Sequence, residues 1–240
     1  MIVSIHQPNY LPWLGFFDKI KRSDLFVIFD DVQFPRGKKH FGHRNQIKTP
    51  NGTKWLSVPI KNKSDMVSFN DTIINYDIDW HHEHLRLMEL NYKDTPYFND
   101  YYQDLETIIK REYKSLTELS TDLIRYFMTK LNIRTTIARS SELSSQYEKG
   151  SDKIFSILEN VNATDYLTGS GPGSQRYIDE EEFKKREINL HWQNYECKEY
   201  NQLFGDFIPY LSVVDLLFNH GEKAGEVIWM WWQSELIQTT

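Results

Sequence analysis

A histidine and two adjacent aspartates are the residues near the amino terminus best suited to proton transfer. His6 follows the apolar run of residues 2–5, and Asp30 and Asp31 follow a second apolar run at residues 25–29. An imidazole titrates near neutral pH, and a neighbouring carboxylate can orient it or accept a proton itself. We therefore predict that His6 is a general base and that Asp30 or Asp31 orients it or replaces it as the base.

The loop after the first apolar run, HQPNYLPWLG, is unusual for a turn. A plain turn needs Gly, Asn, Asp or one Pro, whereas this loop holds Pro8 and Pro12 together with Tyr10 and Trp13. Rigid residues and large rings at a strand end favour the wall of a binding site, with Tyr10 and Trp13 stacked on a base or a sugar. The alternative is an irregular loop whose aromatic side chains cap the core.

A run of basic residues follows Asp31. The segment 32–64 has no Asp or Glu, while the whole chain carries a net charge of −6. Its eight cations are Arg36, Lys38, Lys39, Arg44, Lys48, Lys54, Lys61 and Lys63. A locally cationic segment on an acidic protein favours a discrete anion, such as a phosphorylated small molecule, over a long polyanion. We predict that Arg36, Arg44 and Lys48 bind substrate, the last two through a diphosphate; a solvated basic hairpin is the alternative.

The glycine-rich stretch GSGPGS, residues 169–174, follows a predicted strand. It offers backbone N–H groups and hydroxyls to phosphate or carboxylate oxygens. We expect Gly169 and Ser170, together with Asn45, to donate hydrogen bonds to an oxyanion. The stretch lacks the Lys of a P-loop and the spacing of a dinucleotide fingerprint, so a flexible strand-to-helix turn is the alternative.

The segment LSVVDLLFNHG, residues 211–221, has a polar stripe on an otherwise apolar helix. Ser212, Asp215 and Asn219 recur at intervals of three and four residues. A buried carboxylate is costly unless it is paired or hydrogen-bonded. Asp215 therefore either ties down another loop or, with Asn219, faces a ligand, and the sequence leaves both open.

The histidines do not match a zinc-hydrolase motif. WHHEH, residues 80–84, lacks two histidines four residues apart with Glu beside the first, and His40 and His43 form a separate pair. We predict no metal, and the sequence identifies no cofactor. The single cysteine, Cys197, excludes an internal disulfide and fits a reducing cytoplasm.

The elements that must position these residues form an α/β pattern. Residues 2–5 and 25–29 are predicted strands joined by a short helix at 14–21, which requires parallel strands whose carboxyl ends share one edge. Residues 80–131 have helical periodicity, as a cap or as core-packed helices, and βα alternation resumes from residue 133. We predict a single α/β domain, 1–240, with a Rossmann-like core, a helical insertion at about 80–131 and a C-terminal helical region.

Composition excludes several function classes. No apolar run approaches the roughly 20 residues that span a bilayer, and the start MIVSIHQ lacks the features of a signal peptide. A net charge of −6 argues against DNA binding. We expect a cytoplasmic protein without membrane insertion, in which the aromatic run VIWMWW is core or the contact of a homodimer.

Five ordered motifs resemble the WbqC-like family over nearly the whole chain. They are HQPNYLPWLGFFDKI, SD with FVIFDDVQF, RNQIKTPNGTKWLSVPI, YLTGSG with YID, and FIPYLSVVDLLFNHG. The matching positions are His6, Gln7, Pro8, Tyr10, Pro12, Asp30, Asp31, Gln33, Arg44, Asn45, Lys48, Gly169, Tyr177, Asp215, Asn219 and Gly221. The resemblance thus adds Gln7, Gln33 and Tyr177 to the expected substrate-binding residues. A departure lies at residues 196–200, where the family usually has His-Pro before Tyr and this chain has Cys197-Lys198.

The resemblance implies a function in surface-polysaccharide assembly. The family is associated with bacterial O-antigen gene clusters, and a glycine or other aminoacyl transferase role on amino sugars has been suggested for its members. We predict an N-acyltransferase acting on the amine of a nucleotide-linked amino sugar, with an acyl or aminoacyl donor as the second partner. One alternative is a nucleotidylyl transferase or ATP-dependent ligase. The nucleotide-binding folds of such enzymes also begin with a strand, a His-containing Pro-rich loop, a helix and a strand, but the second His of their signature is absent from this chain. The other is a non-catalytic subunit of the polysaccharide machinery.

Overall fold

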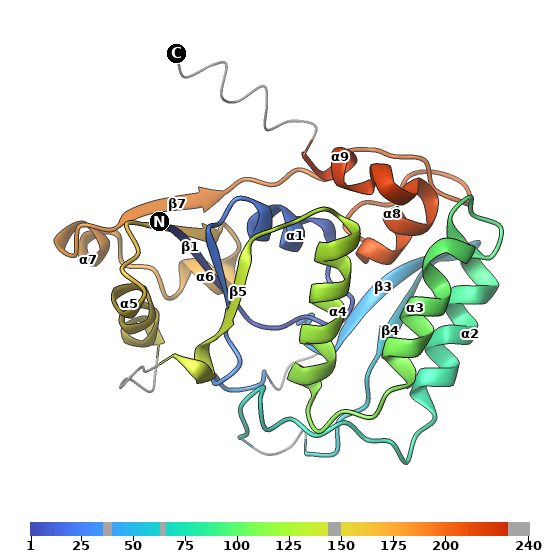
Figure 1. Cartoon of the computed structure of the whole chain (residues 1–240), viewed down its shortest axis with the longest axis horizontal. Helices are drawn as coiled ribbons and strands as arrows, with labels where there is room; N and C mark the ends of the chain where they lie inside the picture. Colours follow the sequence, from blue (N-terminus) through green and yellow to red (C-terminus); the bar gives the residue numbers. More distant parts are fainter. Residues whose placement is uncertain (36–39, 63–65, 144–149, 230–240) are drawn as a thin grey trace.

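A parallel sheet of five strands forms the centre of the protein, whose computed structural model describes residues 1–35, 40–62, 66–143 and 150–229 (Figure 1). The strand order is β5-β2-β1-β6-β7, with β1 at Ile2–His6, β2 at Leu25–Ile28, β5 at Thr136–Arg139, β6 at Asp165–Gly169 and β7 at Asn189–Gln193. The chain adds strands to one side of β1 first and to the other side afterwards, which is the doubly wound arrangement. The predicted Rossmann-like α/β fold is confirmed.

Helices cover both faces of this sheet because successive side chains of a strand point to opposite faces. In β2, Phe26 belongs to the apolar cluster of α1 (Leu14–Lys21), whereas Val27 belongs to that of α5 (Gly150–Asn160). In β1, the ring of His6 points to the α1 face. Phe16 of α1 therefore lies next to His6, the first candidate base.

Three long helices occupy the segment that was predicted to be helical. They are α2 at Trp80–Tyr92, α3 at Phe98–Lys110 and α4 at Leu116–Lys130. Phe127 of α4 meets Phe17 of α1 edge-on, with the ring centroids 5.8 Å apart, and both rings belong to the apolar cluster that includes β2. These helices therefore share the core of the sheet.

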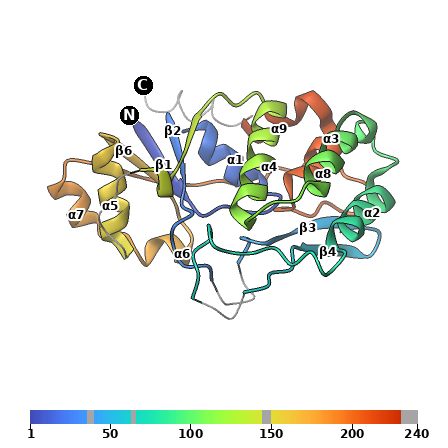
Figure 2. The same cartoon turned by 60° about the horizontal axis from the view of Figure 1, so that its bottom comes forward.

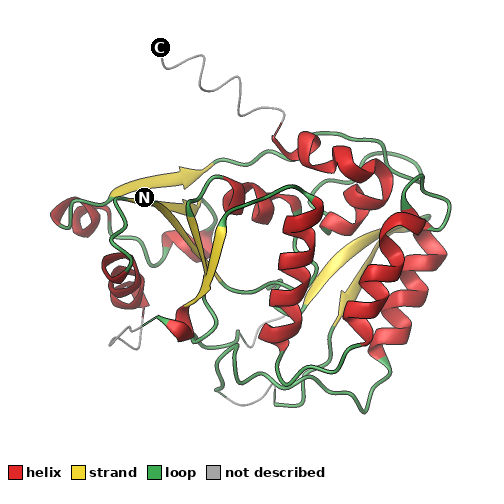
Figure 3. Ribbon diagram, viewed as in Figure 1, coloured by secondary structure: helices red, strands yellow, loops and turns green. Residues whose placement is uncertain are grey.

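A hairpin forms a second, two-stranded sheet beside α2 and α8 (Val213–His220) (Figure 3). Its strands are β3 (Arg44–Thr49) and β4 (Gly52–Ser57), and a turn at residues 50–51 joins them. Gly52 has a φ of +107°, which residues with a side chain rarely adopt. The hairpin carries the cations of residues 44–54 on a layer separate from the central sheet.

The remaining elements are short. They are a 3-10 turn at Ser140–Glu142, α6 at Pro172–Gln175, α7 at Glu180–Lys185, a 3-10 turn at Gly221–Lys223 and α9 at Ala224–Trp229. Ser212 is the N-cap of α8, where its hydroxyl accepts a hydrogen bond from the Val214 N–H. Part of the predicted homodimer contact, residues 230–232, lies outside the described residues. Among the described helices, none has the length and apolar character needed to cross a bilayer.

Candidate functional site

Three residues singled out in the sequence, His6, Asp30 and Gly169, meet at one edge of the central sheet. His6 ends β1 and pairs with Ile28, two residues before Asp30, while Gly169 ends β6 on the other side of β1. The strand order reverses between β1 and β6, so their carboxyl ends form the switch point of the sheet (Figure 2). Ligands of open α/β sheets bind at such a point. The surroundings of His6 and Gly169 are therefore the candidate site.

The ring of His6 is oriented by a backbone carbonyl. Its Nδ1 lies 2.8 Å from the carbonyl oxygen of Gln7, and the ring meets Phe16 edge-on at 5.0 Å between centroids. A carbonyl oxygen only accepts, so in the neutral ring Nδ1 carries the proton and Nε2 keeps its lone pair. Burial, with a contribution from the Lys19 ammonium, lowers the pKa of His6 to about 3. The imidazole is therefore neutral at pH 7, with Nε2 as its proton acceptor.

The Asp30 carboxylate braces the sheet. It is fully buried and accepts hydrogen bonds from Arg139, at 2.7 Å from Nε and 2.6 Å from Nη2, and from the N–H and hydroxyl of Ser141 at 3.0 and 2.8 Å. These partners come from the end of β5 and the turn that follows it, so Asp30 ties the ends of β2 and β5 together. The orienting role that we expected of this carboxylate is taken by the Gln7 carbonyl.

The neighbouring Asp31 links the sheet to α5. It accepts a hydrogen bond from the Ser140 hydroxyl at 2.5 Å and pairs with the Lys153 ammonium at 2.6 Å. No contact within the described part of the chain joins Asp31 to His6. Both aspartates therefore shape the edge on which the candidate base stands, and a catalytic role for either stays a prediction.

A lysine that the sequence interpretation missed lies at the same edge. Lys19 in α1 is only 3% exposed, and its Nζ lies 3.4 Å from the position that a Cβ on Gly169 would take. Side chains of a helix lean toward its amino-terminal end, and α1 starts near the carboxyl edge, so the lysine stem reaches back toward that edge. Burial lowers the pKa of Lys19 to about 8, against the field of Asp18. Its one sequence signal is a spacing of three residues from Phe16 on the buried face of the helix.

The glycine-rich stretch leaves β6 at this edge and is largely exposed. Gly169 is partly buried, Ser170 is exposed, and the hydroxyl of Ser174 lies 3.4 Å from the same Cβ position on Gly169. Tyr177, which is 49% exposed, follows α6. Gly169 thus lies next to both the Lys19 ammonium and the Ser174 hydroxyl, while Ser170 and Tyr177 are exposed.

The opening loop provides core residues as well as surface residues. Tyr10 is fully buried, its hydroxyl lies 2.9 Å from Nδ1 of His84 in α2, and burial raises its pKa. A ring inside the core cannot stack on a ligand, so Tyr10 corresponds to the core-capping alternative. Gln7 is partly buried next to His6 and remains a candidate contact.

Trp13 remains partly exposed in an aromatic group. Its ring meets Tyr195 at 5.5 Å and Tyr210 at 5.7 Å between centroids, both edge-on. It also covers Gly15, where a Cβ would come within 2.1 Å of the indole ring. This close approach explains the glycine, and the exposed part of the group keeps Trp13 as a candidate stacking surface.

Residues of the basic segment that the structure describes have partners of their own. The Arg44 guanidinium lies 4.2 Å from the ring centre of Trp55, and its Nε donates to the His40 carbonyl oxygen at 3.4 Å. The buried amide of Asn45 donates to the Leu11 carbonyl oxygen at 2.6 Å, which fastens the opening loop to the hairpin. Among the described contacts, none joins Arg44 or Asn45 to His6 or Gly169. Gln33 is exposed, and Arg36 lies outside the described residues.

Lys48 and Asp215 belong to one buried hydrogen-bond network. Lys48 Nζ donates to Gln202 Oε1 at 3.0 Å and to a backbone carbonyl at 2.6 Å. Asp215 accepts hydrogen bonds from the hydroxyls of Tyr92 and Tyr200 at 2.8 Å each, and from Gln202 Nε2 at 2.9 Å. Burial raises the pKa of Asp215, and these hydrogen bonds oppose the rise. The network fastens β3, α2, α8 and the loop at 194–212 together.

This network favours a structural role for three residues that we expected at the substrate. The Lys48 ammonium is occupied by internal acceptors instead of a diphosphate, and Asp215 ties down a loop, which was one of its two alternatives. Asn219 donates from Nδ2 to the Asp215 carbonyl oxygen at 2.7 Å, one helical turn earlier. The switch point therefore does not draw on these side chains.

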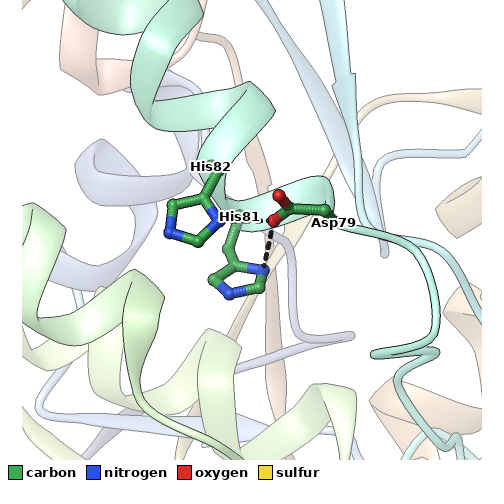
Figure 4. A group of neighbouring side chains, drawn as sticks. All are labelled: Asp79, His81 and His82. Atoms are coloured by element: carbon green, nitrogen blue, oxygen red, sulfur yellow. Dashed lines mark hydrogen bonds and ion pairs between the residues drawn. The ribbon is translucent and has the colours of Figure 1, made fainter.

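One group of possible metal ligands gathers where α2 begins (Figure 4). Ligand atoms of Asp79, His81 and His82 lie within 4.8 Å of one another. The carboxylate accepts a hydrogen bond from Nδ1 of His82 at 2.6 Å and lies 3.4 Å from Nδ1 of His81. The hydrogen bond between Asp79 and His82 forms without an ion, so the prediction of no metal stays a prediction.

Comparisons with known proteins place the chain among relatives. The WbqC-like protein family matches residues 7–227, which include Lys19, Asp30 and Gly169. Rv1507c of Mycobacterium tuberculosis, an uncharacterized protein, is 33% identical over 229 residues, which cover 94% of this chain and 96% of that protein. No solved structure matches the chain. Because the match extends over both sides of the switch point and most of the chain, this protein belongs to the WbqC-like family.

Proposed function

We propose that the protein transfers a glycyl or other aminoacyl group to the amine of a nucleotide-linked amino sugar in surface-polysaccharide biosynthesis. Membership of the WbqC-like family suggests a role in polysaccharide biosynthesis. The observation that carries the proposal is a neutral imidazole, with a free Nε2, at the switch point of a Rossmann-like sheet. Nucleotides are typical ligands of this position.

Acyl transfer to an amine needs a group that accepts a proton. The amine nitrogen attacks the carbonyl carbon of the donor, and its proton moves to Nε2 of His6. The proton then passes to the leaving group as the bond between that group and the carbonyl carbon breaks, so the products are an amide and the protonated leaving group. The Gln7 carbonyl keeps its hydrogen bond to Nδ1–H throughout and favours the imidazolium that forms.

The low pKa of His6 sets a condition on this mechanism. With a pKa lowered to about 3, first by burial and then by the Lys19 ammonium, the imidazole is a weak base in the free protein. An anionic substrate bound beside it favours the charged imidazolium and raises the pKa toward neutrality. The proposal therefore requires a substrate that brings negative charge, as a nucleotide sugar does.

A second candidate function shares the site. Nucleotidylyl transfer, or ligation with ATP, also needs cations and N–H groups at the switch point, and Lys19 beside Gly169 suits the phosphates of a triphosphate. Nucleotidylyl transfer and AMP-forming ligation release pyrophosphate from ATP, and ADP-forming ligation releases inorganic phosphate, whereas acyl transfer from a preformed donor consumes no ATP. The two functions therefore differ in their products.

The test is product analysis with a variant of His6 that lacks the proton-accepting nitrogen. Purified protein is incubated with UDP- and dTDP-amino sugars and with aminoacyl donors of the thioester and ester classes, and mass spectrometry detects the amide. His6→Asn retains a donor to the Gln7 carbonyl but lacks Nε2, so we expect a rate loss of about 10²–10⁴-fold. The matched control is His191→Asn, which changes an exposed histidine outside the site.

The outcomes separate the candidates. Amide formation that falls in His6→Asn and persists in His191→Asn supports the proposal. Full turnover of His6→Asn removes His6 from the mechanism. Pyrophosphate release from ATP without any amide product supports the second candidate, and the absence of every reaction and of small-molecule binding supports a non-catalytic subunit.

A further inference from the structure

Lys19 is an almost fully buried lysine whose ammonium has no partner among the described residues. The side chain is 3% exposed, and Nζ has no hydrogen bond or ion pair with any residue that the structure describes. An ammonium taken out of water is costly unless a counter-ion or hydrogen-bond acceptors replace the lost hydration. A lysine in this position therefore needs either a nearby acid or a bound anion.

The nearby acid is already occupied. Asp18 accepts a hydrogen bond from Arg22 Nε on Oδ1 at 2.9 Å and one from Gln193 Nε2 on Oδ2 at 2.7 Å. The same Gln193 amide donates to the Gly15 carbonyl oxygen at 2.8 Å, which fixes it against α1. Asp18 thus ties α1 to the end of β7 and does not contact the lysine ammonium.

The space in front of Lys19 is kept open by a glycine. Gly169 does not have a left-handed φ, so the backbone there does not require a glycine. A Cβ at this position would meet Lys19 Nζ and Ser174 Oγ, each at 3.4 Å. The Ser174 hydroxyl is partly buried and has no hydrogen-bond partner among the described residues. Two unpartnered donors therefore border the same space at the switch point.

We propose that Lys19, Ser174 and the backbone at Gly169 form a phosphate-binding subsite between the ends of β1 and β6. Lys19 Nζ and Ser174 Oγ donate to phosphoryl oxygens, and the missing Cβ of Gly169 leaves room for them. A phosphate here also lies near His6, whose charge is already sensitive to Lys19. The subsite rests on this geometry alone; its assignment to the diphosphate of a nucleotide sugar rests on the proposed function.

Binding of simple phosphates tests the subsite without turnover. Isothermal titration calorimetry at pH 7 measures inorganic pyrophosphate, UDP and uridine against the full chain. We expect pyrophosphate and UDP to bind and uridine to bind at least tenfold more weakly than UDP. Lys19→Met removes the charge and Gly169→Ala fills the space, and each is expected to weaken pyrophosphate and UDP at least tenfold.

Matched variants control for charge and for glycine loss. Lys21→Met removes an exposed charge from the same helix, and Gly171→Ala adds a methyl group where nothing lies within 4 Å. Both are expected to keep affinities within twofold of the unmodified protein. Circular dichroism confirms folding of each variant, and Gly169→Ala keeps the test valid if Lys19→Met does not fold.

Each result decides the proposal. Unchanged phosphate affinity in folded Lys19→Met or Gly169→Ala overturns the subsite, as does a failure of pyrophosphate and UDP to bind. UDP binding more tightly than pyrophosphate supports the nucleotide assignment, whereas equal affinity supports a bare phosphate subsite and overturns that assignment. If phosphate binds through Lys19 but the protein forms no amide, only the proposed acyl transfer is overturned. If acyl transfer occurs and Lys19→Met leaves KM unchanged, only the subsite is overturned.

Discussion

At the scale of single residues, Lys19 combines a cost in stability with a place in the candidate site. Its pKa falls from 10.5 to about 8 because the folded protein disfavours the charged form. The unfolded chain therefore binds more protons between these two values, so the penalty is fully present below pH 8 and disappears as the pH rises toward 10.5. An unpaired buried ammonium destabilises the free protein, and a bound anion would offset this cost, as expected of an anion-binding site.

Lys19→Met is therefore expected to stabilise the protein in the absence of ligand. The shift of the pKa corresponds to a gain of ~3 kcal/mol in the free energy of unfolding at pH 7, and methionine fills a similar volume. Urea denaturation of Lys19→Met and of the exposed Lys21→Met measures the difference. If Lys19→Met is less stable than the unmodified protein, the Lys19 ammonium has a stabilising partner and the interpretation of an unpaired charge is wrong.

Two histidines with lowered pKa values, His6 and His84, predict a loss of stability in mild acid. Burial lowers the pKa of both His6 and His84 to about 3, below the 6.5 of an unfolded chain, so unfolding takes up protons as the pH falls below 6.5. Each residue is expected to remove ~2 kcal/mol of stability between pH 6.5 and pH 5. His84→Asn keeps an amide near Tyr10. It is expected to remove the contribution of His84 to this loss of stability and to leave that of His6.

Unfolding free energies at pH 7 and pH 5 measure this effect. The exposed His191→Asn variant is the matched control. If the free energy of unfolding changes equally between pH 7 and pH 5 in His84→Asn and in the unmodified protein, His84 is not held neutral by burial.

His6, Asp30 and Gly169 could be found from the sequence because each follows an apolar run at a predicted strand end. Parallel pairing then places those ends together. Lys19 could not be found in this way, since its spacing from Phe16 places it on the buried face of its helix but does not mark it as a ligand-binding residue. The neighbouring glycine, Gly169, belongs to β6 and lies 150 residues later in the chain.

At the scale of elements, the ends of β2 and β5 depend on one buried ion pair. Arg139→Met leaves Asp30 buried without its cation, which is expected to lower the free energy of unfolding by about 3–5 kcal/mol. Urea denaturation measures the loss. Arg111→Met, which breaks an exposed pair with Asp122, is the control and is expected to cost no more than about 1 kcal/mol. Similar losses in the two variants would contradict the brace.

The helices at 80–131 and the parallel pairing of the first two strands could be predicted from the sequence, but the partners of the hairpin could not. The basic segment was interpreted as an anion-binding surface because its charge is visible in the sequence. The acceptors of Lys48 lie in the loop at 194–212, and Asn45 fastens the opening loop, so folding assigns both residues to bracing. Charge along the chain does not reveal which cations become buried between elements.

At the scale of the whole molecule, two regions could attract an anionic substrate. One is the hairpin, where the Arg44 guanidinium lies over the Trp55 ring, and the other is the switch point, where the Lys19 ammonium lies next to Gly169. They belong to different sheets. The switch point places the anion beside Nε2 of His6, which has no hydrogen-bond partner among the described residues and is the proton acceptor of the proposed chemistry. The proposed chemistry therefore belongs to the switch point.

Mapping of backbone amides by NMR during a titration with UDP compares these regions directly. We predict the largest chemical-shift changes at Gln7, Lys19, Gly169 and Ser170, with Thr53 and Lys54 of the hairpin unchanged. Changes confined to residues 44–57, with Lys19 and Gly169 unaffected, would contradict the switch point as the functional site.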